Sequence, residues 1–208
     1  MIAAEGMVAA PVGDETAPEK VPLVIARRKA KSAAFVSIIE PYSTAPAIRA
    51  ITPLAATDAL GFRIAREKPE DVLLFSNTRG VKRIGDYTLE GEIAWLTQTD
   101  GALQSLYLGA GTKLTGTRWS VSIESLVTGG DAAQLGVLIE RVAPNRWIIR
   151  NASTVAGIVT LEGLGAGKLG GYKLDQSGNR QGELRPIESE NGIIRFFVDP
   201  KTAYEIGL

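Results

Sequence analysis

The chain has 208 residues, 45% of them hydrophobic, with 23 basic and 23 acidic side chains and therefore no formal net charge. It contains neither His nor Cys, which excludes thiol nucleophiles, disulfides and thiolate metal sites and removes the side chain best suited to proton transfer near neutral pH. The balanced charge argues against nucleic acid or an anionic membrane as the main partner, because both attract a basic excess.

Residues 1–20 are rich in Ala, Gly, Pro, Glu and Asp and lack periodicity. This composition predicts a flexible tail or linker remnant, followed by one domain over residues 21–208. The first residues are too acidic for a secretory signal, and no apolar run approaches the ~20 residues of a membrane helix. We therefore expect no membrane partner, and the sequence leaves the cellular location unknown.

From Val21 onward, short β-branched and aromatic runs alternate with turn residues at the regular spacing that is typical of a sandwich or barrel. In chain order the expected strands are 22–28, 33–40, 47–54, 59–66, 71–76, 92–96, 104–108, 118–126, 135–142, 146–151, 157–162, 170–174, 182–187 and 192–198. No segment shows apolar residues at helical spacing over the length that a helix needs. We predict an all-β fold, a two-sheet antiparallel β-sandwich of roughly 12–14 strands with a flexible N-terminal tail.

Turn residues separate several of these strands. Thr99-Asp100-Gly101 between two apolar runs is the strongest hairpin signal, because Asp and Gly tolerate positive φ. Ala143-Pro144-Asn145 and Gln176-Ser177-Gly178-Asn179 predict two further turns. Gly109-Ala110-Gly111 is expected to break the strand that ends at Leu108.

One glycine-rich segment, 163–168, superficially resembles a phosphate-binding loop. Leu169 stands where that loop requires Ser or Thr, and no helix is expected to follow. A glycine-rich connection between strands explains the segment better. We predict no cofactor and no metal site.

The aromatic residues could form a sugar-stacking platform or belong to the core. Trp95 and Trp119 alternate with apolar neighbours within strands, which favours the core for both. Trp147 lies beside a turn and is the better candidate for exposure. The candidate carbohydrate contacts are Trp147, Tyr172, Tyr42 and Arg49.

Charged residues gather in two places. Basic residues crowd the first third of the chain, where arginine forks could bind an acidic polysaccharide, although a solvated strand face is the favoured explanation. Asp86, Glu90, Glu92 and Asp100 surround the strongest hairpin, and two carboxylates at a defined separation would suit a His-free glycosidase. Charges at strand ends and turns are ordinary, so we predict no catalytic residue.

The segments Val21–Arg28 and Phe35–Tyr42 (FVSIIEPY) are followed by further distinctive runs at 71–77, 89–95 and 106–111. Together they resemble the β portion of the heparinase II/III-like polysaccharide lyases, and the likeness extends from Val21 to Leu126. Members of that family pair an α/α toroid with antiparallel β-sheets and cleave uronate-containing polysaccharides by β-elimination. The family's catalytic Tyr and His residues lie in the toroid and in the first part of the β region.

The resemblance implies the C-terminal β-sandwich of such a lyase, as a fragment or a stand-alone relative. This chain has no toroid and no His, so no catalytic residue is carried over, and Tyr42 receives no family role. The expected function is a noncatalytic structural or accessory domain that supports a catalytic toroid, in the same protein or a partner chain, and forms one wall of the substrate cleft. An independent carbohydrate-binding module and a His-free glycosidase are the alternatives.

A domain that packs against a toroid should leave one sheet face uncovered. The early apolar residues cannot all point into one core, because Phe35 and Ile38 have opposite parity within one strand. We expect an exposed apolar patch, and hence a homodimer or concentration-dependent aggregation. The residues that supply this apolar character are Phe35, Ile38, Phe62, Ile64, Leu73 and Phe75.

Overall fold

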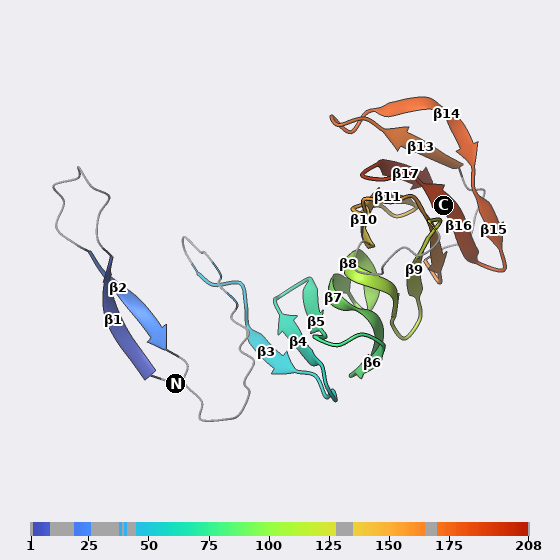
Figure 1. Ribbon diagram of the computed structural model, residues 1–208. Coiled ribbons are helices and arrows are strands. Elements are labelled where there is room, and N and C mark those ends of the chain that lie inside the picture. Colours follow the sequence, from blue (N-terminus) through green and yellow to red (C-terminus); the bar gives the residue numbers. More distant parts are fainter. Residues whose placement is uncertain are drawn as a thin grey trace. The chain divides into compact units, whose positions relative to one another are not determined.

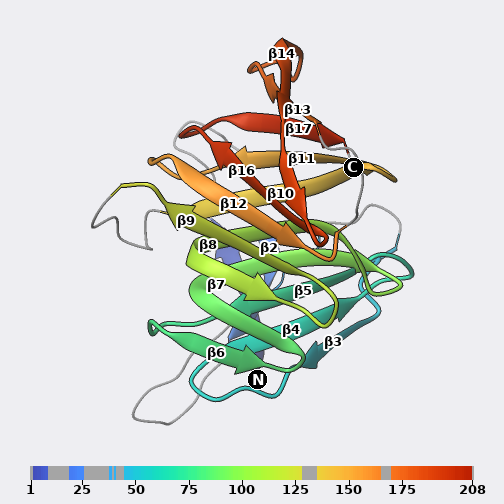
Figure 2. The same ribbon diagram turned by 90° about the vertical axis from the view of Figure 1, so that its right-hand side faces the viewer.

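The computed structural model describes residues 2–8, 19–25, 38, 40, 45–127, 135–164 and 170–207, and Figures 1 and 2 show it from two sides. These residues form strands, turns and irregular connections without any helix, which confirms the all-β prediction. It follows that none of them belongs to a helix that could span a membrane. The chain divides into two compact units, residues 1–41 and residues 42–208.

The first unit contains an antiparallel pair of strands. β1 (Ile2–Val8) pairs with β2 (Glu19–Ile25), with Ile2 opposite Ile25. β1 is not among the strands that the sequence predicts, because cross-strand backbone hydrogen bonds can form without a periodic side-chain pattern. Of the strand expected over residues 33–40, only Ile38 and Glu40 are among the described residues.

The second unit is one antiparallel network of 15 strands. Ten of them follow the order β14-β13-β17-β11-β10-β8-β7-β5-β4-β3, and the other five branch from this path. The strands are β3 (Ala50–Pro53), β4 (Leu60–Ala65), β5 (Glu70–Phe75), β6 (Val81–Ile84), β7 (Tyr87–Thr99), β8 (Ala102–Thr115), β9 (Ser120–Ser125), β10 (Gly136–Ala143), β11 (Arg146–Asn151), β12 (Gly157–Glu162), β13 (Gly170–Leu174), β14 (Arg180–Pro186), β15 (Glu188–Glu190), β16 (Ile193–Val198) and β17 (Ala203–Gly207).

The long hairpin β7–β8 divides this network into two layers. Its end nearest the turn pairs with β5 and β10 in the first layer, which runs from β3 to β14. Its other end pairs with β6 and β9 in the second layer, which continues through β12 and β16 to β15. The predicted two-sheet sandwich is therefore present, with its two sheets joined through shared strands (Figure 2).

Two glycines allow the hairpin to bend from one layer to the other. A Cβ at Gly91 would lie 2.8 Å from the Cα of Gly111, and a Cβ at Gly111 would lie 2.6 Å from the Cα of Gly91. The register shifts at this point, and Ala110 adopts a φ of 49°. The prediction that β8 ends here is wrong: the strand continues to Thr115, because a bulge and a bend absorb the glycines without ending the pairing.

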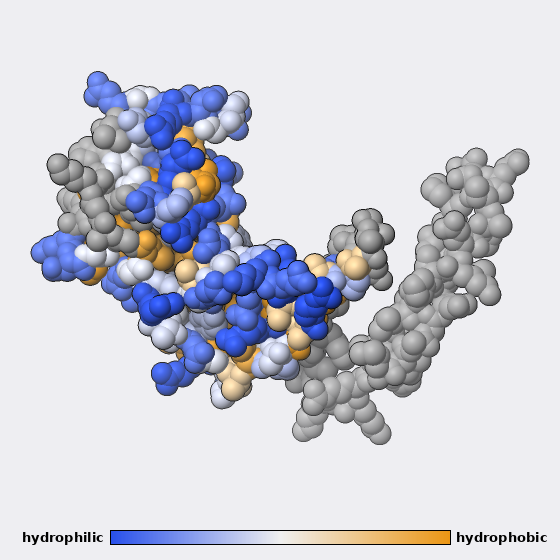
Figure 3. All heavy atoms as spheres, turned by 180° about the vertical axis from the view of Figure 1, so that it is seen from behind, coloured by the Kyte–Doolittle hydropathy of each residue, from blue (hydrophilic) through white to orange (hydrophobic). Residues whose placement is uncertain are grey.

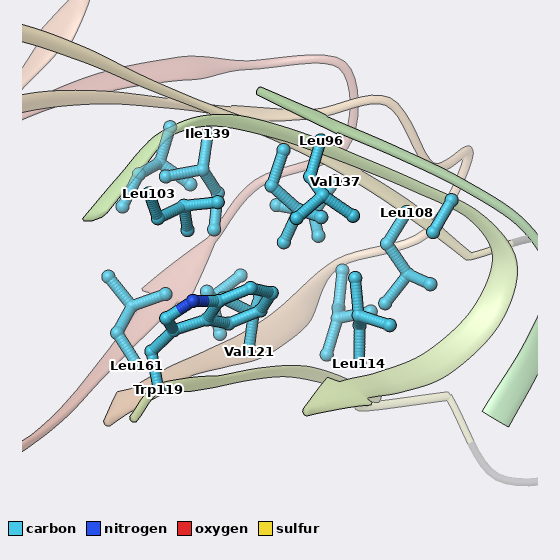
Figure 4. Packing of buried hydrophobic residues seen from close by; sticks show 14 of the residues in the cluster. Leu96, Leu103, Leu108, Leu114, Trp119, Val121, Val137, Ile139 and Leu161 are labelled. Carbon is cyan, nitrogen blue, oxygen red and sulfur yellow. The ribbon is translucent and has the colours of Figure 1, made fainter. Parts of the chain in front are cut away.

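The core lies between the two layers, as Figure 4 shows. Alternate residues of each strand point inward, because the side-chain period of a strand is two. Trp119 is 6% exposed and packs within this cluster, which confirms the core prediction for that residue. Fully buried side chains include Leu96, Leu106 and Ile139 of the first layer and Leu114, Val121 and Leu161 of the second.

Candidate functional site

A polar cleft of about 540 Å³ lies at one end of the sandwich, and its lining residues come from both layers. The first layer supplies the β4–β5 connection and the turn that joins β7 to β8. The second layer supplies the β6–β7 turn and the β8–β9 connection. We call it the turn cleft, and its volume falls within the roughly 300–1,000 Å³ of small-ligand sites.

The β7–β8 turn has the geometry that the sequence predicts. Asp100 and Gly101 have φ values of 52° and 76°, as a two-residue type I′ hairpin requires. Asp100 and Gly101 both line the turn cleft. The strongest local signal in the sequence therefore shapes one wall of the candidate site.

Tyr87 and Gln98 join the two layers within the cleft. Both are buried, and the Tyr87 hydroxyl donates a hydrogen bond to Gln98 Oε1 at 3.1 Å. Burial raises the pKa of Tyr87 above its ordinary value of 10.0, and the nearby Arg63 charge offsets part of this effect. The phenol is therefore protonated at neutral pH and acts as a hydrogen-bond donor.

Most charged groups that line the cleft are already paired. Arg63 Nε lies 3.2 Å from Glu70 Oε1, and Lys68 Nζ lies 3.1 Å from Asp100 Oδ2. The side chains of the first pair are 39% and 36% exposed, and those of the second are 69% and 73% exposed. Because both pairs are exposed to solvent to this extent, each contributes little to the stability of the fold.

A buried carboxylate, Asp71, holds a third cation beside the cleft. Its side chain is only 3% exposed, and it forms an ion pair with the lining residue Arg66. Its other oxygen accepts a hydrogen bond from Thr97 Oγ1 at 2.8 Å. Both carboxylate oxygens are therefore satisfied, and Arg66 is anchored at the edge of the cleft.

Two lining charges, Asp86 and Arg118, form no ion pair within the part of the chain that the structure describes. Asp86 lies close enough to Tyr87 for its negative charge to contribute to the raised pKa of that residue. Arg118 lies over the β7–β8 turn, where a Cβ on Gly101 would be 3.1 Å from its Nη2 atom. Both charges are available to a ligand.

A second candidate surface lies on the outer side of the first layer. Trp95 on β7 stands opposite Leu73 on β5 and Tyr107 on β8, and Leu73 in turn stands opposite Phe62 on β4. Trp95 is 51% exposed and Tyr107 is 37% exposed. We call the row Phe62, Leu73, Trp95 and Tyr107 the outer aromatic face. In the space-filling view of Figure 3, apolar residues form orange areas among polar ones.

The exposure of Trp95 corrects the sequence prediction that placed it in the core. Its neighbours Ala94 and Leu96 are fully buried and occupy the inner face of β7. Because this strand carries apolar residues at both parities, alternation alone assigned Trp95 to the wrong side. The structure thus reveals an exposed Trp that the sequence did not single out as a contact.

An open hollow of about 450 Å³ adjoins this face, and its lining includes Tyr107 of the face and also Ile93. Ile93 lies two residues from Trp95 on the same side of β7. The Tyr107 ring lies across Gly109, where a Cβ would be 2.7 Å from the phenolic oxygen. The aromatic side chain therefore covers a glycine position of its own strand.

The outer aromatic face contains part of the apolar patch that the sequence predicts. Phe62, Leu73 and Phe75 lie on this side with partial exposure. Ile64 has the same parity as Phe62 but is only 5% exposed. Of the other expected members, Ile38 is partly buried and Phe35 lies outside the described residues.

Trp147, the leading candidate for sugar contact, is 2% exposed, so its predicted exposure is wrong. The β10–β11 turn consists of Pro144 and Asn145 alone, so Trp147 already belongs to β11 and points into the core. The guanidinium of Arg141 lies 5.9 Å from the centre of its ring. Proximity to a turn in sequence did not place the side chain at the surface.

Tyr172 is partly buried on β13, and a charged group covers its ring. The Arg180 guanidinium carbon lies 4.7 Å from the ring centre. Arg180 also pairs with Glu205, whose carboxylate lies 3.9 Å from Arg146 Nε. We call Arg146, Tyr172, Arg180 and Glu205 the charged cluster. One ring face of Tyr172 is therefore occupied within the chain itself.

The structure does not bring the predicted contact residues together. Arg49 is exposed immediately before β3 and pairs with Glu67 at 3.2 Å, whereas Tyr172 lies on β13 near the other end of the strand order. Tyr42 lies outside the described residues. The predicted set is thus not one site.

Of the carboxylates noted around the hairpin, Asp86 and Asp100 line the turn cleft, whereas Glu90 and Glu92 do not. The described residues contain no cluster of three or more acidic side chains that could hold a metal ion. Comparison with protein-family models and with curated proteins gives no match.

Proposed function

We propose that this chain is the noncatalytic β-sandwich of a heparinase II/III-like polysaccharide lyase, and that its outer aromatic face packs against a catalytic α/α toroid. The observation that carries the proposal is the exposed pair Trp95 and Tyr107. This pair lies on β7 and β8, which together with β5 contain the segments 71–77, 89–95 and 106–111 that resemble the family.

The composition of the outer aromatic face supports a role in packing against another domain. Trp, Tyr and Phe are enriched in the buried centres of protein interfaces, where each removes a large apolar area from water. Trp95 and Tyr107 are direct cross-strand neighbours, so one partner surface can cover both.

A noncatalytic role agrees with the chemistry of the turn cleft. Three of the four lining acids that the structure describes, Glu67, Glu70 and Asp100, are paired with cations, which leaves Asp86 as a single unpaired carboxylate rather than the two that a glycosidase uses. Among the residues that the structure describes, Tyr87 is the one tyrosine that lines the cleft, and burial raises its pKa, which is the opposite of what a tyrosine base requires. The chain has no His that could replace it.

The noncatalytic claim is tested by incubating the purified chain with alginate, heparin and heparan sulfate and following the ultraviolet absorbance of unsaturated uronates. We expect no turnover. Robust turnover by this chain alone would refute the claim, whatever the state of the outer aromatic face.

The docking claim is tested by titrating the chain with any α/α toroid that its genomic neighbourhood proves to encode. We expect Trp95→Ala and Tyr107→Ala to weaken association by tenfold or more, as truncation of interface aromatics does. Arg180→Ala in the charged cluster is the matched control and should leave the affinity unchanged. Equal affinities for all variants would contradict the assigned docking face.

A carbohydrate-binding module is the second candidate, because Trp95 and Tyr107 together also form a platform on which sugar rings could stack. In that case the chain alone binds polysaccharide, acidic chains included, and Trp95→Ala abolishes this binding.

Self-association offers a further readout of the same face. We expect light scattering to detect a homodimer or aggregates at high concentration, and Trp95→Gln to shift the chain toward monomer.

A further inference from the structure

The turn cleft lies apart from the outer aromatic face, and the proposed function does not use it. Its lining residues Arg63 and Gln98 occupy inner positions on β4 and β7, whereas Trp95 points outward. We infer that the turn cleft is a binding site for a neutral saccharide unit, and that it discriminates against anionic ligands.

The first argument is the balance of charge around the cleft. The cleft is lined by equal numbers of cations and acids, so no net positive field attracts a carboxylate or a sulfate. The cations are Arg63, Arg66, Lys68 and Arg118, and the acids are Glu67, Glu70, Asp86 and Asp100. The residues just outside preserve the balance, since Arg49 pairs with Glu67 and Asp71 pairs with Arg66.

The second argument is the mixture of donors and acceptors. A sugar hydroxyl both donates and accepts hydrogen bonds, so a polyhydroxylated ligand needs both kinds of partner close together. Guanidinium and ammonium groups only donate, and ionised carboxylates only accept. Arg63 with Glu70, and Lys68 with Asp100, present one of each at 3.2 and 3.1 Å.

The third argument is that the site is formed in advance. Asp71 anchors Arg66, and the hydrogen bond between Tyr87 and Gln98 joins two buried polar side chains of the lining. Binding then requires little ordering of side chains, which reduces the entropic cost of association. Asp86 and Arg118 supply one acceptor and one donor that are not engaged by other described residues.

The experiment uses heteronuclear NMR of the full chain with two sets of probes. The first set contains neutral hexasaccharides of glucose, mannose, xylose and galactose, and the second contains hexauronates of matched length. We expect at least one neutral oligosaccharide to shift the backbone signals of 66–70, 86–87 and 98–101, with weaker or no shifts from the hexauronates. Raising the salt concentration should leave the neutral affinity unchanged, because no net charge is neutralised.

Variants assign any binding to the cleft. Asp86→Ala and Arg118→Ala should each weaken the affinity by about tenfold, the loss of one hydrogen bond to a charged group. Arg150→Ala, which removes an exposed ion pair with Glu140 outside every candidate site, is the matched control and should bind like the parent chain. Equal thermal midpoints of the variants would show that they remain folded.

Two results would overturn the inference. One is that no neutral probe binds, or that binding is insensitive to both cleft variants. The other is that the hexauronates bind more tightly with a strong salt dependence, which would show that Arg118 governs an anion site. Both results leave the docking role of the outer aromatic face untouched, so the two proposals fail separately.

Discussion

The outer surface of the first layer has two halves, which differ in how they cover an outward-pointing aromatic side chain. On β4, β5, β7 and β8 it carries the outer aromatic face, with Trp95 51% exposed. On β11, β13, β14 and β17 it carries the charged cluster, where Arg180 covers the Tyr172 ring and pairs with Glu205. Both halves place an aromatic residue outward, yet only the second covers that residue with its own chain.

We propose that this difference determines which half binds a partner. A charged half whose groups satisfy one another is stable against water and gains little from a second surface. In the aromatic half, apolar area stays in contact with water, which is unfavourable, so burial of that area against another surface lowers the free energy. The lyase-family resemblance on which the proposed function rests covers Val21 to Leu126, a range that includes the aromatic half and excludes the charged half.

The largest expected effect is the difference in stability loss between truncating a Trp on the inner side of this layer and truncating one on its outer side. Trp147→Ala should lower the free energy of unfolding by about 3–5 kcal/mol, because it empties a site in the core. Trp95→Ala should cost only about 0.4–2 kcal/mol, the range of its two cross-strand pairs with Leu73 and Tyr107. Denaturant unfolding of both variants measures the two values. Equal losses would mean that the two Trp residues have the same burial.

A second comparison tests a carboxylate in each half. Asp71→Asn should cost about 1–3 kcal/mol, because the side chain is nearly inaccessible and leaves Arg66 and Thr97 without an ionised acceptor. Glu205→Gln should cost about 1 kcal/mol or less, because its partners Arg146 and Arg180 are about half exposed to solvent. Urea unfolding at low and high salt checks both values. A larger loss of stability for Glu205→Gln than for Asp71→Asn would mean that Glu205, and not Asp71, belongs to the more buried ion pair.

A third test concerns Tyr87, the buried phenol between the two layers. Its raised pKa means that the unfolded chain releases the phenolic proton at a lower pH than the folded chain does. The resulting stabilisation is complete below the ordinary pKa of 10.0 and is lost as the pH rises through the folded pKa. Stability should therefore fall in this alkaline range.

The Tyr87→Phe variant has no such proton and should show a weaker alkaline decline. Near neutral pH it should be less stable by about 1 kcal/mol, because it lacks the hydrogen bond to Gln98. Unfolding midpoints across the alkaline range measure the effect. Parallel curves for the two chains would mean that Tyr87 does not cause the decline.

The smallest expected effect is in the charged cluster. Arg180→Ala should leave the unfolding midpoint unchanged within error, because an exposed ion pair contributes little to stability. It should, however, uncover the Tyr172 ring, which quenching of tyrosine fluorescence by a neutral solute would detect. An unchanged quenching constant would indicate that Arg180 does not shield the ring.

Local pattern was sufficient to predict most of the fold. Alternation and turn chemistry placed β12 and β13 with their observed bounds, and Asp100-Gly101 predicted the β7–β8 hairpin. The strands β6, β15 and β17 were missed, because each is only three to five residues long and is too short for a period to be recognised. A short strand forms because neighbouring strands pair with it, and its own sequence pattern contributes little.

The sequence by itself determined that this protein is a β-sandwich without histidine or thiol chemistry. Only the tertiary structure decided which face of each strand is buried, and it exchanged the expected roles of Trp95 and Trp147. The physical reason is that alternation defines two faces but does not say which one a second layer will cover. The turn cleft depends on the same step, since Tyr87 and Gln98 are 11 residues apart and meet only because β7 bends between two layers.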